Sequence, residues 1–134
     1  MNSIGGNPIR VLLVDDHAMM RQVLRGFLSA CPGLEVVGEA GNGEEALQSV
    51  QTLSPSVVVM DINMPRLNGI EATDRIKQAY PHVAVVGLSM NADEDYRHAM
   101  IKAGATAVLS KVAGIAQLCD EINLSVRSPS AAIC

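Results

Sequence analysis

Short apolar runs, rich in β-branched residues, alternate along this chain with longer segments whose apolar residues recur at helical spacing. The short runs lie at residues 9–14, 34–37, 57–60, 83–88 and 105–109. Most of them are almost continuously apolar, which is typical of parallel strands that are covered on both faces. We therefore predict a strand–helix unit repeated five times, with helices on both sides of one parallel sheet.

The segments between the apolar runs carry signals for helix ends. Asn42 has the character of an N-cap, with Glu45 three residues further on. Pro and Gly residues follow several of the segments and predict where the helices end. The five helices are expected at about 16–31, 42–53, 67–80, 93–103 and 115–122.

Length and composition limit the class of protein. The chain has 134 residues and 49% hydrophobic residues, enough for one domain with its own core. We expect a flexible N-terminus at 1–8, the domain at 9–124, and a tail or the start of a linker at 125–134. The net charge is −4 and no basic face is visible, which argues against direct nucleic acid binding by this domain.

Cysteine usage and hydropathy indicate a cellular location. The three cysteines are far apart and form no C-x-x-C motif, so neither a disulfide framework nor a zinc site is expected. No apolar run approaches the roughly 20 residues that cross a bilayer, and no secretory signal is recognisable. These observations predict a cytoplasmic protein without membrane contact.

Chemically active side chains stand at the ends of four predicted strands. Asp15 and Asp16 follow the first strand, Asp61 the third, Ser89 the fourth and Lys111 the fifth. The carboxyl ends of parallel strands are where such sheets bind ligands, so these side chains are expected to converge. Clustered carboxylates repel one another unless a cation is present, and Mg²⁺ prefers carboxylate oxygens. The pattern predicts a magnesium site with a lysine beside it.

Each of these residues also has an ordinary explanation. Asp16 could only cap a helix, Lys111 could be a surface lysine, and Ser89 alone indicates little. Their joint occurrence at matching strand ends favours a site. His17, next to the acidic pair, is interpreted as a solvent-exposed residue of the first helical turn.

The motifs, taken together, resemble the receiver domains of bacterial two-component response regulators, over residues 10–122. Among these receivers the chain looks most like those of LuxR-type regulators. The resemblance implies a flavodoxin-like, doubly wound α/β fold with strand order 2-1-3-4-5. It rests on Val14-Asp15-Asp16-His17, Met60-Asp61, Met64-Pro65, Asn68-Gly69, Leu88-Ser89 and Ser110-Lys111.

The resemblance also implies roles for the site residues. Asp61 would be the phosphoacceptor, Ser89 the switch hydroxyl and Lys111 the cation that contacts the phosphoryl group. Mg²⁺ would be held by Asp15, Asp16, Asp61 and the backbone carbonyl of Asn63. The expected function is a phosphorylation-dependent switch, not an enzyme.

The expected partner is a sensor histidine kinase or a phosphotransfer protein. A DNA-binding or other output domain is expected outside this sequence if the chain comes from a longer regulator. A homodimer through the fourth and fifth helices and simple packing of these helices on the sheet both stay open.

Three departures from the receiver pattern bear on the output. Val108 stands where an aromatic residue is usual, Val112 where proline is usual, and Met90 where a small residue is common. Because of these departures, a degenerate receiver that acts as a constitutive protein-interaction module stays an alternative. A phosphatase with an aspartate nucleophile is disfavoured because Asn63 cannot act as an acid. A nucleotide or flavin binder is disfavoured because no Gly-rich phosphate loop follows a strand.

Overall fold

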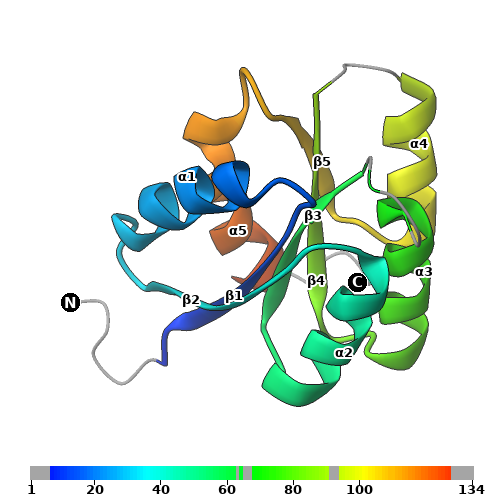
Figure 1. Ribbon diagram of the computed structural model, residues 1–134, viewed down its shortest axis with the longest axis horizontal. Coiled ribbons are helices and arrows are strands. Elements are labelled where there is room, and N and C mark those ends of the chain that lie inside the picture. Colours follow the sequence, from blue (N-terminus) through cyan, green and yellow to red (C-terminus); the bar gives the residue numbers. More distant parts are fainter. Residues whose placement is uncertain (1–6, 63, 65–67, 91–93, 128–134) are drawn as a thin grey trace.

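The computed structural model describes residues 7–62, 64, 68–90 and 94–127 (Figure 1). The strands are β1 (Ile9–Val14), β2 (Leu34–Ala40), β3 (Val57–Asp61), β4 (Ala84–Ser89) and β5 (Ala107–Ser110). The helices are α1 (Ala18–Ser29), α2 (Gly43–Leu53), α3 (Gly69–Ala79), α4 (Glu94–Ala103) and α5 (Leu118–Arg127), with a 3₁₀ turn, η1 (Ile115–Gln117), before α5.

All five strands are parallel and lie in the order β2-β1-β3-β4-β5, which confirms the predicted flavodoxin-like topology. The strands end nearly level with one another. Val14 pairs with both Ala40 and Met60, Asp61 pairs with Leu88, and Ser89 pairs with Ser110. The residues that follow β1, β3, β4 and β5 therefore share one edge of the sheet.

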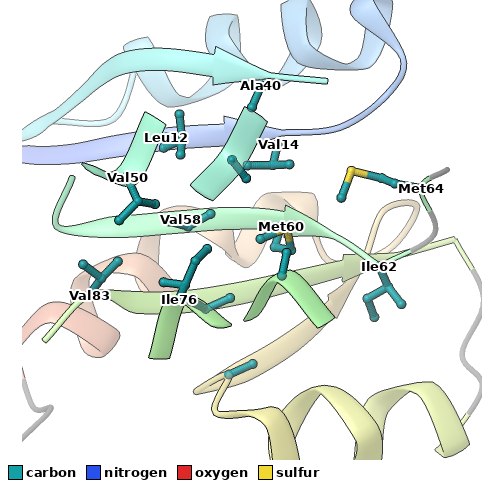
Figure 2. Close-up of a cluster of buried hydrophobic side chains, with 14 of the residues drawn as sticks. Leu12, Val14, Ala40, Val50, Val58, Met60, Ile62, Met64, Ile76 and Val83 are labelled. Atoms are coloured by element: carbon teal, nitrogen blue, oxygen red, sulfur yellow. The ribbon is translucent and has the colours of Figure 1, made fainter. Parts of the chain in front are cut away.

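Helices cover both faces of the sheet. α1 and α5 lie on one face, and α2, α3 and α4 lie on the other (Figure 1). β3 and β4 are buried throughout and β1 is buried after its first two residues, as expected for central strands of a doubly wound sheet. On the α2–α4 side, aliphatic side chains and methionines fill the core without aromatic rings at its centre (Figure 2).

Two helices begin with the same asparagine cap. The side chain of Asn42 accepts the N–H of Glu45, as predicted, and that of Asn68 accepts the N–H of Glu71, both at 2.9 Å. Gly69, the first residue of α3, donates its N–H to the carbonyl of Ile62 at 3.1 Å. The start of α3 is thereby held directly against the end of β3.

Element ends differ from the sequence prediction by a few residues. β5 covers residues 107–110 and not 105–109, and α1 begins at Ala18 and not at Asp16. α5 continues to Arg127, so Ser125, expected in the tail, lies in a helix. Its side chain is buried and forms a hydrogen bond with the Thr106 hydroxyl at 2.8 Å. No described helix is both long and apolar enough to cross a membrane.

Candidate functional site

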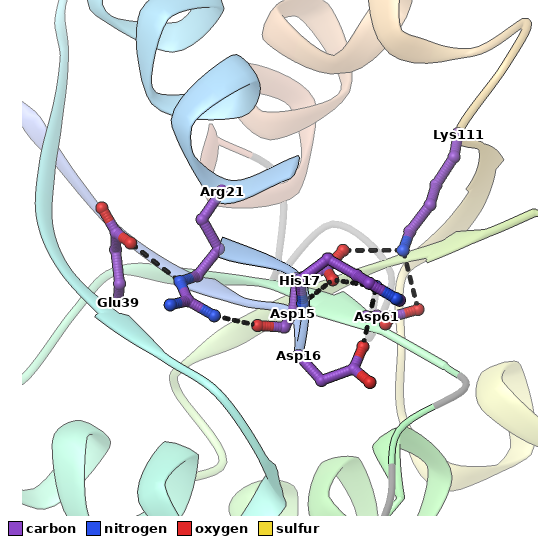
Figure 3. Close-up of polar contacts among 7 residues, drawn as sticks. All are labelled: Asp15, Asp16, His17, Arg21, Glu39, Asp61 and Lys111. Atoms are coloured by element: carbon purple, nitrogen blue, oxygen red, sulfur yellow. Dashed lines mark hydrogen bonds and ion pairs between the residues drawn. The ribbon is translucent and has the colours of Figure 1, made fainter. Parts of the chain in front are cut away.

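Lys111 joins the ends of β1, β3 and β5 through two carboxylates (Figure 3). Its Nζ donates to Asp15 Oδ2 at 2.6 Å and lies 3.1 Å from Asp61 Oδ1. All three side chains are at most 4% exposed. Charge-assisted hydrogen bonds of this length are strong because little water competes for them.

Lys111 stays charged in this setting. Burial by itself would lower the pKa of Lys111, but its hydrogen bond to Asp15 and the charges of Asp61 and Asp15 outweigh it. The pKa therefore lies above its ordinary value of 10.5. One ammonium thus faces two carboxylates, and the group keeps a negative charge.

Asp16 and His17 lie on the more exposed side of the site, next to the buried Asp15. The carboxylate of Asp15 also accepts the backbone N–H of His17 at 2.8 Å. His17 Nδ1 lies 3.3 Å from Asp15 Oδ1 and 3.0 Å from Asp16 Oδ1. The imidazole is 71% exposed, in agreement with the solvent-exposed position expected from the sequence. The contacts of this ring with both carboxylates were not predicted.

The donor set fits a hard divalent cation. One ligand atom from each of Asp15, Asp16, His17 and Asp61 lies within 4.8 Å of the others. The buried Oδ1 of Asp16 makes no hydrogen bond within the described residues, and its contact there is His17 Nδ1 at 3.0 Å. Carboxylate oxygens facing one another at such distances are the ligands that Mg²⁺ prefers, and with Lys111 they leave a net negative charge to neutralise. Asn63, whose carbonyl was expected as a further ligand, lies outside the described residues.

The switch residues expected from the sequence lie beside this cluster. Ser89 ends β4 and is buried, and its carbonyl accepts the N–H of Lys111 at 2.8 Å. Met90, directly after it, is 57% exposed. Val108 packs, partly buried, against the core, and its Cγ2 and Met100 Cε approach the same side of Gly87. Methionine and valine thus fill the space above Gly87 on β4.

A second polar group, not foreseen from the sequence, supports the end of β1. Arg21 of α1 donates from Nη1 to the backbone carbonyl of Asp15 and from Nε to Glu39 Oε1, the latter at 2.8 Å (Figure 3). Arg25 donates to Glu39 Oε2 at 2.7 Å. The four-residue spacing of Arg21 and Arg25 on one helix face was the available signal, but it did not identify their partner.

Comparison with protein families gives a clear match. Residues 11–123 match the family model described as the response regulator receiver domain. The response regulator GacA of Pseudomonas viridiflava is 38% identical over 116 residues, which are 87% of this chain and 54% of GacA. DegU, a transcriptional regulatory protein of Brevibacillus brevis, is 40% identical over 81% of this chain and 46% of its own. The chain thus spans about half the length of these relatives.

Solved structures agree with this match. The response regulator domain of Thermotoga maritima CheB has a TM-score of 0.83 and 32% identity, over 90% of this chain and 97% of its own. A LuxR-family two-component response regulator from Aurantimonas has a TM-score of 0.81 and 27% identity, over 93% of this chain and 99% of its own.

One expectation from the sequence has to be corrected. The chain was expected to be a phosphoacceptor switch and not an enzyme. However, a protein-glutamate methylesterase/protein-glutamine glutaminase of Geobacter metallireducens is 45% identical over 79% of this chain. This chain matches only 31% of that protein's length. The exclusion of enzymes is therefore wrong, because a domain similar to this chain forms part of an enzyme.

Proposed function

We propose that this chain, which belongs to the response regulator receiver domain family, is a switch that accepts a phosphoryl group on Asp61. The observation that carries the proposal is the buried contact of one ammonium, Lys111 Nζ, with both Asp15 and Asp61. A carboxylate beside a fixed ammonium and a cluster of oxygen ligands is equipped to take up a phosphoryl group.

The transfer itself needs little from the protein beyond positioning. A carboxylate oxygen of Asp61 attacks the phosphorus of a phosphohistidine on a sensor kinase or phosphotransfer protein. The new P–O bond forms as the P–N bond breaks, and the departing imidazole nitrogen keeps the electron pair and takes a proton from solvent. Asp15, Asp16 and Asp61, with the carbonyl of Asn63, would hold Mg²⁺, which neutralises charge on the phosphoryl oxygens when it is bound.

Phosphorylation would then redistribute the contacts of Lys111 and Ser89. The phosphoryl group adds negative charge and strong acceptor oxygens at Asp61. Lys111 Nζ, already 3.1 Å from Asp61 Oδ1, would bind one of these oxygens, and the Ser89 hydroxyl would donate to another. Ser89 ends β4 and Lys111 directly follows β5 at the same sheet edge, so their movement would change how β5 and α4 pack.

Further parts of the function stay predictions. This chain matches about half of GacA and of DegU, and DegU is described as a transcriptional regulatory protein; both facts favour a longer regulator with an output domain beyond this chain. Homodimerisation through α4 and α5 and a cytoplasmic location also stay predictions.

Labelling with acetyl phosphate, read by intact mass, tests the proposal. We expect one added phosphoryl group that requires Mg²⁺ and is absent in Asp61→Asn. Asp74→Asn, which removes an exposed acid of α3, is the matched control and should label like the parent chain. Labelling that persists in Asp61→Asn would refute the site. A chain that neither labels nor binds Mg²⁺ would instead favour the degenerate receiver.

A further inference from the structure

We propose that Arg21 is a positioning residue that aims Asp16 at the cation by holding the backbone carbonyl of Asp15. The inference deepens the proposed function and rests on it, because it concerns the same cation site. It assigns a task to a side chain that touches neither the expected cation nor the phosphoryl group.

The carbonyl of Asp15 needs a donor that the sheet cannot supply. β1 pairs with β2 up to Val14 and Ala40, and the N–H of Asp15 makes one more bond, to the Ala40 carbonyl at 3.0 Å. The chain then turns into α1. Asp15 is 1% exposed, and a buried carbonyl without a partner destabilises the fold. Nη1 of Arg21, from the first turn of α1, donates to this carbonyl.

The guanidinium of Arg21 is itself held in place. Its Nε donates to Glu39 Oε1 near the end of β2, and Glu39 is further held by Arg25 (Figure 3). The hydrogen bond from Arg25 lowers the pKa of Glu39, partial burial opposes this, and Arg21 lowers it further. Glu39 is therefore charged at neutral pH. The planar guanidinium, bonded through two of its nitrogens, keeps one orientation between β1 and β2.

This orientation bears on Asp16 through the peptide plane. The carbonyl of Asp15 and the N–H of Asp16 belong to one planar unit, so the direction of the carbonyl sets the direction in which the chain continues. The side chain of Asp15 is already held by Lys111 and by the N–H of His17. Asp16 Oδ1 makes no hydrogen bond within the described residues and is contacted only by the imidazole of His17, at 3.0 Å, whose side chain is 71% exposed and free to turn into solvent. The placement of Asp16 therefore depends on the backbone, and Arg21 holds that backbone.

Positioning and simple electrostatics predict opposite effects when Arg21 is removed. Arg21 is a cation near a cation site, so loss of its charge alone would strengthen Mg²⁺ binding. Loss of positioning would weaken Mg²⁺ binding, because Asp16 would no longer face the ion. Residues that orient metal ligands change metal affinity by about 10- to 100-fold when they are replaced.

The test compares Arg21→Ala with Arg25→Ala. Both variants lose one arginine bonded to Glu39, but only the first loses the donor to Asp15. We expect Arg21→Ala to raise the Mg²⁺ dissociation constant, measured by calorimetry, about 10-fold, whereas Arg25→Ala stays within about twofold. Arg21→Lys, which keeps the charge and one donor, should recover part of the affinity. Unchanged or tighter Mg²⁺ binding in a folded Arg21→Ala chain would overturn the proposal.

A second readout separates this inference from the proposed function. In the metal-free chain, the NMR shift of the Asp16 amide should change in Arg21→Ala and not in Arg25→Ala. If the parent chain binds no Mg²⁺, the proposed function fails and this role of Arg21 fails with it. If the parent chain binds Mg²⁺ and the Asp16 amide is unmoved in both Arg21→Ala and Arg21→Lys, only the role of Arg21 fails.

Discussion

Replacement of Lys111 by methionine should destabilise the metal-free chain much more than the chain with Mg²⁺. Lys111 Nζ lies 2.6 Å from Asp15 Oδ2 and 3.1 Å from Asp61 Oδ1, and both carboxylates are at most 3% exposed. Methionine keeps most of the side-chain volume but leaves two buried carboxylates without their cation. Removing one member of a buried ion pair typically costs about 3–5 kcal/mol.

The expected loss lies at the lower end of that range. Asp16 is 26% exposed and His17 71%, so water can enter from their side and solvate the carboxylates. We therefore expect Lys111→Met to lower the free energy of unfolding by about 3 kcal/mol without Mg²⁺, which corresponds to about 10 °C in Tm. Bound Mg²⁺ supplies the missing positive charge, so the loss should shrink to about 1 kcal/mol when the ion is saturating.

Neutral pH is suitable for this measurement. The folded pKa of Lys111 is above its ordinary value of 10.5. A raised pKa means that the stabilisation is fully present below the unfolded value and is lost only as the pH rises through the folded value. At pH 7 the parent chain therefore has the whole contribution.

The assay is urea unfolding followed by far-ultraviolet circular dichroism, with EDTA and with Mg²⁺. Lys102→Met, which removes an exposed lysine of α4, is the matched control and should stay within about 0.5 kcal/mol of the parent. A loss below about 1 kcal/mol in EDTA would show that the buried carboxylates do not depend on Lys111. A large loss that Mg²⁺ does not reduce would contradict the shared neutralisation of Asp15 and Asp61.

Two further predictions concern stability. Gly69→Ala would place a Cβ that overlaps the backbone carbonyl oxygen of Asp61. We expect this variant to lower the free energy of unfolding by about 1–3 kcal/mol and to reduce phosphoryl labelling. Gly26→Ala in α1, where nothing lies within 4 Å, should instead stabilise by about 0.5–1 kcal/mol; equal effects in urea unfolding would rule out the close approach. Hydrogen bonds from Arg25 and Arg21 hold the pKa of Glu39 in the folded chain below its ordinary value of 4.5. The stabilisation by these ion pairs is therefore present above pH 4.5 and is lost as the pH falls through the pKa of Glu39 in the folded chain. The difference in unfolding free energy between the parent and Glu39→Gln should be at most about 1 kcal/mol at neutral pH and vanish in acid; a difference that is independent of pH would disprove the assignment.

The sequence predicted the sheet and the convergence of its end residues because both follow from local patterns. Apolar runs and capping residues define the elements, and parallel strands of similar length end at one edge. Asp15, Asp61 and Lys111, which are far apart in the chain, meet there. Element ends were less certain, since the start of β5 depends on pairing with β4 and not on its own residues.

The support of the site could not be predicted in the same way. The sequence does not predict the bonds of Arg21 to the Asp15 carbonyl and to Glu39. These bonds depend on the distance between α1 and the sheet and on the rotamer of the Arg21 side chain. Backbone acceptors have no sequence signature at all, since every residue has one. His17 shows the same limit: its exposure was expected, but its approach to Asp16 follows from the turn between β1 and α1.

The two basic side chains at the end of β1 have different relations to the cation. Lys111 contacts Asp15 and Asp61 directly, so it would stabilise the metal-free chain and would compete with Mg²⁺ for the same oxygens. Arg21 forms an ion pair with Glu39 and contacts Asp15 only at its backbone carbonyl, so it does not compete for the carboxylate oxygens of the site. Lys111→Met should therefore tighten Mg²⁺ binding while it weakens the fold, whereas Arg21→Ala should weaken Mg²⁺ binding. Opposite shifts from the loss of the same unit of positive charge cannot arise from net charge alone. They require that one side chain supplies charge to the site and the other supplies geometry.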